Sequence, residues 1–282
     1  MLIVYYGSCQ TAAIAKIIRL NLTKCGIPFT DCIIQNWVHI LNKTTLPKEI
    51  YDCDYLIYQP YNGSDENVEY HTDKVLKKIS YKTKTISIPF ISSAMYWPDN
   101  VSDARNNKTK TDKLPFGKFP QQSCILSRCR SVDEMHNNLY KEHYDKFYLN
   151  NHLKRDLAKM TSGEELCDVK ICDYIEAHLA NSVPLFHSIQ HPTNDILLEV
   201  AKRVLKHFNI ELSEIPSEEL LGDHTVLILP YVKIFYNTVR STYKLYGREY
   251  VSEKTYLDEY FNSINSQEIG FDFWAKPVIP AK

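Results

Sequence analysis

Two short segments near opposite ends of the chain carry side chains suited to nucleophilic chemistry. Cys9 follows the apolar run LIVYY and Gly7, and it comes directly before a helical pattern. His191 stands in the segment LFHSIQHPTND, which also leads into a helical pattern. A thiol within reach of an imidazole forms the nucleophile-and-base pair of acyl transfer. We therefore take Cys9 as the candidate nucleophile and His191 as its candidate base.

The position of Cys9 at the start of a helix predicts a reactive thiol. Unpaired backbone N–H groups and the helix dipole favour negative charge at a helix N-terminus. We therefore expect the pKa of the Cys9 thiol to be lowered, and the same N–H groups to hold a developing oxyanion. Ser8 and Gln10 flank Cys9 and offer further hydrogen bonds. The alternative is that Cys9 is a small buried residue at an ordinary turn.

The surroundings of His191 predict an imidazole held at the end of a strand. Pro192 biases His191 toward an extended backbone, and Thr193 or Asn194 is suited to cap the helix that follows. Open α/β sheets bind ligands at the carboxyl ends of their strands. Cys9 and His191 can interact only if both turns lie at the same sheet edge. The alternative is a surface histidine in a proline turn.

The elements that must position these residues follow an α/β pattern. Short apolar segments predict strands at 2–6, 30–34, 55–58 and 83–88, and helical patterns lie at 10–24 and 69–79. Gly26 stands where a left-handed residue would end the first of these helices. Strands separated by helices favour a mainly parallel sheet, because parallel strands need crossover connections. We expect an α/β fold with this sheet flanked by helices.

The second half of the chain is predicted to interrupt and then resume this pattern. Periodicity is absent over 99–130, and two capping boxes, Ser131 with Glu134 and Ser162 with Glu165, predict helices from each serine, the second reaching about Leu179. A strand at 183–187, an amphipathic helix at 195–208 and a last strand at 225–229 follow. We expect a single α/β domain over 1–282, with a loop and helical insertion at about 100–180 and a helical C-terminal extension at about 231–282.

Composition excludes several classes of function. The formal charge of the 282 residues is -1, which gives no support for nucleic-acid binding. No apolar run reaches the roughly 18 residues of a membrane span, and no export signal is evident, so we expect a cytoplasmic protein. The eight cysteines form no CxxC pair, so we expect no disulfide framework and no metal. A glycine-rich nucleotide-binding turn is also missing.

Four elements, in order over about residues 1–210, resemble the WcbI family of capsular-polysaccharide biosynthesis enzymes. The first is GSCQ at 7–10, where Ser8 replaces the usual Asn of a GNCQ-like element. The second is Gln59 with Pro60, and the third is the aromatic-proline segment IPFISSAMYWPD. The fourth is Leu185 and Phe186 followed by HPTN at 191–194.

This resemblance implies an O-acetyltransferase that moves an acetyl group from acetyl-CoA to a sugar hydroxyl of a capsular or surface glycan. Cys9 would be the nucleophile or would position the thioester, and His191 would be the general base. Gln59, Ser8 and Gln10 would bind substrate or stabilise the oxyanion. Coenzyme A also carries phosphates, for which Arg128 and Arg130 are the candidate ligands. The partner would be a sugar nucleotide or a polysaccharide acceptor.

Two other functions remain open. A nucleophile after the first strand and a late HP turn are also similar to the SGNH/GDSL hydrolases, although Ser188 stands where that family has its Asp. The chain would then be an esterase or deacetylase working through Cys9. The other alternative is a non-catalytic glycan- or nucleotide-binding subunit of a biosynthetic complex. In each case the Tyr-rich C-terminal region offers an interface for a homodimer.

Overall fold

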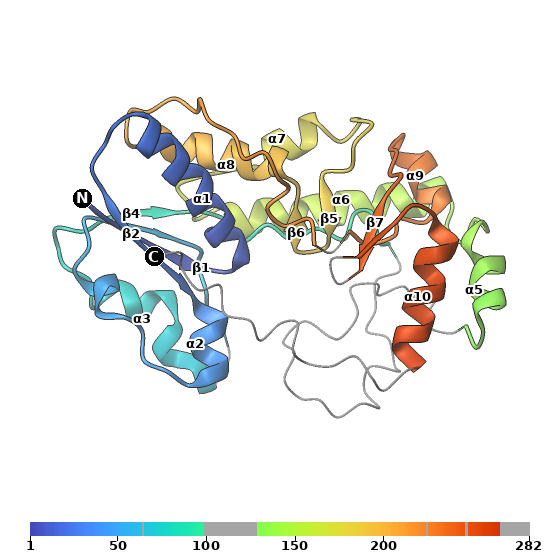
Figure 1. The fold of residues 1–282 in the computed structure, drawn as a ribbon, viewed down its shortest axis with the longest axis horizontal. Coiled ribbons are helices and arrows are strands. Elements are labelled where there is room, and N and C mark those ends of the chain that lie inside the picture. Colours follow the sequence, from blue (N-terminus) through green and yellow to red (C-terminus); the bar gives the residue numbers. More distant parts are fainter. Residues whose placement is uncertain (64, 99–128, 224, 246–247, 266–282) are drawn as a thin grey trace. The chain divides into compact units, whose positions relative to one another are not determined.

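The protein consists of two compact units, seen in a computed structural model that describes residues 1–63, 65–98, 129–223, 225–245 and 248–265 (Figure 1). The first unit contains Met1–Ser93 and Asn151–Gly222, and the second contains Ala94–Asn150 and Asp223–Lys282. Residues 99–128 of the aperiodic segment predicted at 99–130 lie outside the described residues.

A four-stranded parallel sheet forms the centre of the first unit, which confirms the predicted α/β class. Its strands are β1 (Leu2–Gly7), β2 (Thr30–Gln35), β3 (Tyr55–Tyr58) and β4 (Lys84–Ser87), in the order β2-β1-β3-β4. The four predicted strands are therefore correct to within one residue at each end. In register, Val4 of β1 faces Cys32 of β2 and Leu56 of β3.

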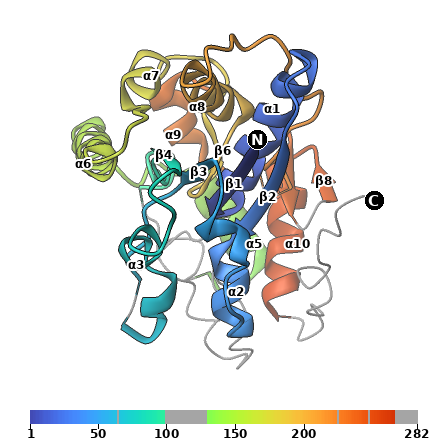
Figure 2. The ribbon, with the colours of Figure 1, turned by 90° about the vertical axis from the view of Figure 1, so that its left-hand side faces the viewer.

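Helices cover both faces of this sheet, and its two central strands, β1 and β3, are accordingly the most apolar and the most buried. Helix α1 (Cys9–Lys24) packs against α8 (Asn194–Lys206) on one face, and α2 (Asn36–Asn42) and α3 (Thr72–Leu76) lie on the other (Figure 2). Successive side chains of β1 alternate between the faces. Val4 and Tyr6 accordingly join the core cluster beneath Val75 of α3.

The helices predicted at 10–24 and 195–208 are confirmed, with ends that differ by at most two residues. Helix α1 ends before Gly26, whose φ of 66° is the left-handed conformation expected there. Helix α8 buries the apolar stripe that its sequence periodicity predicts. The buried members of that stripe are Ile196, Leu197, Val200, Ala201, Val204 and Leu205.

The predicted helix over 69–79 is wrong at both ends. The chain instead forms a 3-10 segment, η2 (Asp65–Tyr70), followed by the short helix α3. His71 separates them because its extended backbone, with ψ of 136°, breaks the helical run. A further 3-10 turn, η1 (Lys48–Tyr51), precedes β3.

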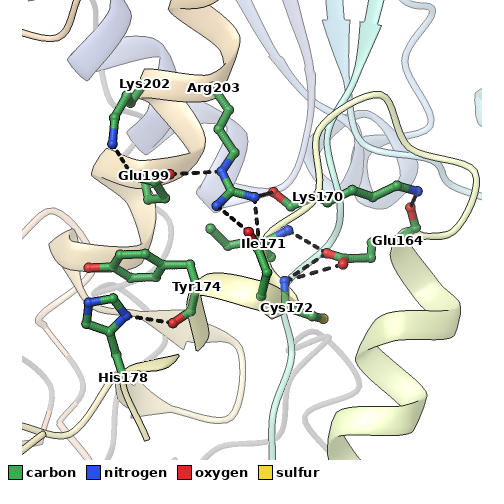
Figure 3. A network of polar contacts seen from close by, with 10 residues as sticks. Glu164, Lys170, Ile171, Cys172, Tyr174, His178, Glu199, Lys202 and Arg203 are labelled. Atoms are coloured by element: carbon green, nitrogen blue, oxygen red, sulfur yellow. Dashed lines mark hydrogen bonds and ion pairs between the residues drawn. The ribbon is translucent and has the colours of Figure 1, made fainter. Parts of the chain in front are cut away.

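The second predicted capping box is also wrong. Helix α6 (Lys146–Glu164) starts much earlier, where the Asp145 carboxylate accepts a hydrogen bond from the Tyr148 N–H at 2.7 Å, and it places Ser162 in its last turn. The next helix, α7 (Cys172–Ala177), begins only at Cys172. Glu164 caps it from a distance, accepting from the N–H groups of Ile171 at 2.6 Å and Cys172 at 3.2 Å (Figure 3).

An arginine-centred network holds α7 against α8 (Figure 3). The Arg203 guanidinium makes two parallel hydrogen bonds to Asp173, at 2.7 and 2.9 Å, and a third to Glu199 at 2.9 Å. It also donates to the Lys170 carbonyl at 2.8 Å. Hydrogen bonding to Arg203 lowers the pKa of Asp173. Bidentate arginine geometry adds orientation as well as energy, so α7 is fixed in direction on α8.

The strand predicted at 183–187 exists only in part and does not join the parallel sheet. Strand β5 (Phe186–Ser188) pairs with β6 (His191–Pro192) in a small antiparallel hairpin, with a register shift between Phe186 and Ser188. His191 therefore projects from a hairpin beside the sheet rather than from the end of a sheet strand.

The second unit is built on tyrosine-rich packing. It contains α5 (Val132–Leu139), α9 (Pro230–Tyr236), the hairpin of β7 (Tyr243–Leu245) and β8 (Arg248–Tyr250), and α10 (Glu253–Asn265). The helix start predicted at Ser131 is confirmed, because the Ser131 hydroxyl accepts from the Glu134 N–H at 3.1 Å, while the Glu134 carboxylate accepts from the Arg130 N–H. Tyr96 and Tyr236 meet edge to face in its core, at 5.0 Å between ring centroids.

The last predicted strand, at 225–229, is wrong. Thr225 makes a single bridge to Lys244, and the residues after it stay outside any sheet. Two of their carbonyls accept side-chain hydrogen bonds instead, Val226 from Arg240 and Leu227 from Trp97, each at 2.9 Å. Over the described ranges, no helix is both long and apolar enough to cross a membrane.

Asn21 is a buried polar anchor in α1. Its side-chain nitrogen donates to the carbonyls of Ile17 and Glu214 at 2.9 Å each. Its oxygen accepts from the N–H groups of Ser213 and Glu214 at 2.8 and 2.9 Å. The side chain thus attaches the chain beyond α8 to α1.

We expect Asn21→Ala to lower the free energy of unfolding by about 2–3 kcal/mol, because it leaves several backbone groups without their partner. Urea denaturation measures this change. Asn42→Ala is the matched control: its side chain makes the corresponding bond one turn back, to Val38, but is exposed. A change within about 0.5 kcal/mol is expected there. Equal losses in the two variants would contradict the anchoring role.

Candidate active site

Cys9 and His191 lie together in the first unit. The distance from Cys9 Sγ to His191 Nε2 is 3.9 Å, although the residues are 182 positions apart in the chain. Cys9 is the first residue of α1 and His191 the first of β6, and both are partly exposed. A sulfur and a ring nitrogen at this separation can exchange a proton after a small adjustment, since catalytic contacts are often long without substrate.

The turn before Cys9 is held by Ser8 and Gln59. The Ser8 hydroxyl caps α1 by accepting from the Gln10 N–H at 3.2 Å, and it donates to Gln59 Oε1 at 2.6 Å. The same oxygen accepts from the Ser8 N–H at 2.9 Å. Ser8 therefore provides the capping oxygen of α1.

Gly7 is required for this close approach. A Cβ at this position would lie 2.3 Å from Thr11 Oγ1 and 2.9 Å from Gln59 Oε1, both inside van der Waals contact. Any larger residue would push Gln59 away from the turn, and with it the partner of Ser8. Gly7 thus allows the backbone of the turn to lie close to Thr11 of α1 and to Gln59 after β3.

The side chains of Gln10 and Gln59 form a buried glutamine network that joins four segments. Gln59 Nε2 donates to Gln10 Oε1 at 3.0 Å and to the Pro89 carbonyl at 3.1 Å. Gln10 Nε2 donates to the carbonyls of Ile91 and Gln190, each at 2.7 Å. The Ile91 N–H returns a bond to Gln10 Oε1 at 3.0 Å. The network therefore connects the Cys9 turn, the ends of β3 and β4, and the hairpin of His191.

These contacts bear on the oxyanion role predicted for Gln10 and Gln59. All four side-chain amide hydrogens are used inside the protein, and both side chains are buried. Their direct effect is to place the Cys9 turn and the hairpin. Donation from either side chain to a substrate oxygen stays a prediction and would require one of these bonds to break.

The hairpin of His191 has further attachments. The Ser93 N–H donates to the Ile189 carbonyl at 2.8 Å, and the Thr193 N–H donates to the Leu185 carbonyl at 2.9 Å. The predicted side-chain cap by Thr193 or Asn194 is wrong, since Thr193 occupies the N-cap position without such a bond. The carboxylate of Glu219 accepts from the Asn194 N–H instead, at 3.0 Å.

The predicted direction of the Cys9 pKa shift is wrong. Burial raises the pKa of the thiol above its ordinary value of 9.0, and hydrogen bonds from the Gln10 and Cys9 amides lower it only in part. A helix N-terminus stabilises a charge by about 1 kcal/mol or less, whereas loss of hydration costs more. The thiol is therefore protonated at neutral pH, and a thiolate forms only if a base removes the proton.

The two predicted phosphate ligands are Arg128 and Arg130. Arg128 lies outside the described residues. Arg130 is exposed in the second unit, and its backbone N–H donates to Glu134 Oε2 at 2.7 Å. Phosphate binding by both arginines stays a prediction. In the part of the chain that the structure describes, no group of three or more His, Cys, Asp or Glu side chains is arranged to hold a metal.

Several positions that shape the site have no signal in the sequence. Pro89, Ile91 and Gln190 act through backbone atoms: their carbonyls are common to every residue type, and the N–H of Ile91 to every type except proline. Glu219 is 28 residues beyond His191 in an irregular segment. Its bond to the Asn194 N–H forms only because the chain folds back to the start of α8, which local patterns do not predict.

Comparisons with known proteins agree with this architecture. The family model described as polysaccharide biosynthesis enzyme WcbI matches residues 2–213, which include every residue of the Cys9 turn, the glutamine network and the His191 hairpin. No curated protein matches the chain.

A solved structure of WcbI, described as a novel polysaccharide biosynthesis enzyme, has a similar fold. It is the native protein without a disulfide bond between coenzyme A and one of its cysteines. The TM-score is 0.72 at 16% identity, and the match covers 93% of this chain and 89% of the other. The chain belongs to the WcbI family of polysaccharide biosynthesis enzymes.

Proposed function

We propose that this chain is an O-acetyltransferase that moves an acetyl group from acetyl-CoA to a sugar hydroxyl of a surface polysaccharide. The observation that carries the proposal is the 3.9 Å separation between Cys9 Sγ and His191 Nε2 at the start of α1. Membership in a family of polysaccharide biosynthesis enzymes supports a sugar acceptor. The coenzyme A named for the similar solved structure supports the choice of donor.

The first step forms an acetylated Cys9. His191 Nε2 accepts the thiol proton of Cys9 while the sulfur bonds to the carbonyl carbon of the thioester. The bond from that carbon to the sulfur of coenzyme A breaks, and this sulfur leaves with the proton that His191 held. Because burial keeps the Cys9 thiol protonated, the step depends on His191 more strongly than it would for a pre-formed thiolate.

The second step transfers the acetyl group. His191, neutral again, accepts the proton of the sugar hydroxyl while its oxygen bonds to the acetyl carbon. The carbon–sulfur bond to Cys9 breaks, and the sulfur recovers the proton from His191. In the direct route, Cys9 only positions the thioester and His191 activates the sugar hydroxyl without an acetylated cysteine.

The glutamine network would keep these groups in place throughout. Gln10 and Gln59 bond to each other and to the backbone on both sides of the dyad. Holding the groups in a fixed orientation lowers the barrier of a two-substrate reaction, because less translational and rotational entropy is lost on reaching the transition state.

We expect coenzyme A and acetyl-CoA to raise the Tm of the protein by about 5 °C or more at saturating concentration, since a ligand that binds only the folded state stabilises it. Thermal-shift measurements with ATP and a sugar nucleotide serve as comparisons. A shift with those ligands and none with coenzyme A would refute the proposed donor and favour a binding subunit.

We expect Cys9→Ala and His191→Ala each to lower the rate of acetyl transfer by about 10²–10⁴-fold while the Tm shift by coenzyme A is retained. Transfer is followed by release of free coenzyme A in the presence of sugar acceptors. Cys25→Ala is the control, because Cys25 is exposed at the other end of α1.

Mass spectrometry of the Cys9 peptide after mixing with acetyl-CoA alone separates the two routes, since only the covalent one acetylates the cysteine. Wild-type transfer by Cys9→Ala would contradict the mechanism. Cys9-dependent cleavage of a simple acetyl ester with no transfer from acetyl-CoA would identify a hydrolase instead.

We expect alkylation of Cys9 by iodoacetamide to rise with pH and to have its midpoint above pH 9.0, because burial raises the thiol pKa. The rate rises with pH because the thiolate is the nucleophile, and a raised pKa leaves less thiolate at neutral pH. The exposed Cys25 provides an internal reference in the same digest. A rate already constant below pH 7 would instead indicate a standing thiolate–imidazolium pair.

A further inference from the structure

The chain returns to the site after α8 through residues 213–220. The first part of this segment is fixed on α1 by Asn21, as described above. Its second part meets Asn194, the first residue of α8. The Asn194 side chain donates to the Glu218 carbonyl at 2.7 Å and accepts from the Leu220 N–H at 3.1 Å. The 213–220 segment therefore connects the helix that begins with Cys9 to the helix that follows His191.

Glu219 uses one carboxylate oxygen for two bonds within this segment. Its Oε2 accepts from the Asn194 N–H at 3.0 Å and from His187 Nε2 at 2.9 Å. A negative charge is favourable at the N-terminus of a helix, where backbone N–H groups are unpaired. The carboxylate thus serves as the cap that neither Thr193 nor Asn194 supplies.

His187 lies at the irregular point of the β5–β6 hairpin. Phe186 pairs with Pro192 and Ser188 with His191, so His187 is the residue at which the register shifts. An extra residue in one strand of a hairpin is a β-bulge, and it changes the direction of the neighbouring side chains. The His187 ring is held by Glu219, and only 12% of its side chain is exposed.

Glu219 consequently holds both strands of the hairpin at its open end. It holds β5 through His187 and the end of β6 through Asn194. The tip of the same hairpin is held separately, by bonds from Gln10 to Gln190 and from Ser93 to Ile189. His191 lies between these two sets of attachments, so its ring position depends on both.

We propose that Glu219 is a positioning residue for His191, acting through His187 and the first amide of α8. The proposal rests on the proposed function in taking His191 as the base. The bonds of Glu219 that carry it are to His187 and Asn194, which take no part in the proposed reaction. Its side chain is 45% exposed, so its replacement removes the two bonds without opening a cavity in the core.

The test compares Glu219→Ala, Glu219→Gln and the control Glu211→Ala, an exposed carboxylate just before the 213–220 segment. In Glu219→Ala we expect the backbone amides of peptides covering residues 185–194 to exchange hydrogen about tenfold faster, with exchange in β1 and β3 unchanged. The kcat of acetyl transfer should fall about tenfold while the KM for acetyl-CoA stays within twofold. Glu219→Gln, whose amide oxygen still accepts both bonds, should restore most of each property.

Wild-type exchange of the hairpin peptides in Glu219→Ala would overturn the proposal. So would an equal increase in exchange over the hairpin and the parallel strands, since that indicates a general loss of stability. Hydrogen exchange requires neither acetyl-CoA nor turnover. An absence of acetyl transfer in the unmodified protein would therefore refute the proposed function while the exchange result still decided whether Glu219 holds the hairpin.

Discussion

The hydrogen bonding of two buried amides, those of Gln10 and Gln59, is the constraint on which the site depends. Each amide has two donor hydrogens and an acceptor oxygen, and leaving any of them unpaired in the interior is costly. The side chains satisfy one another and the backbone at Pro89, Ile91 and Gln190. Because so many bonds must form together, four chain segments are held in one arrangement, and Cys9 and His191 come to lie at the same place.

The same enclosure determines the chemical state of Cys9. Packing that brings the thiol beside His191 also removes water from it, so its pKa rises in spite of the helix N-terminus. A standing thiolate would be reactive toward many electrophiles, whereas a protonated thiol becomes a nucleophile only when a base and a carbonyl are both in position. In the proposed mechanism, the nucleophile therefore forms only when substrate is bound.

Most residues of the family elements hold Cys9 and His191 in position. Gly7 provides space, Ser8 caps α1, and Gln10 and Gln59 link the strand ends. Asn194, the last residue of HPTN, attaches α8 to Glu218 and Leu220, which lie beyond the family match. The geometry of the candidate site therefore involves distant parts of the chain, and the 213–220 segment is the clearest case.

Local patterns in the sequence determined the parallel strands, the ends of α1, the apolar face of α8 and the placement of Cys9 and His191 at turns. These features depend on side-chain period, caps and glycine, which act over a few residues. Tertiary structure decided the pairing of His191 in a hairpin, the capping of α7 by Glu164 and of α8 by Glu219, and the direction of the Cys9 pKa shift. Each of these depends on groups far apart in the chain or on how much water packing excludes. Neither distant contacts nor the exclusion of water leaves a pattern in neighbouring residues, so both are defined only by the folded chain.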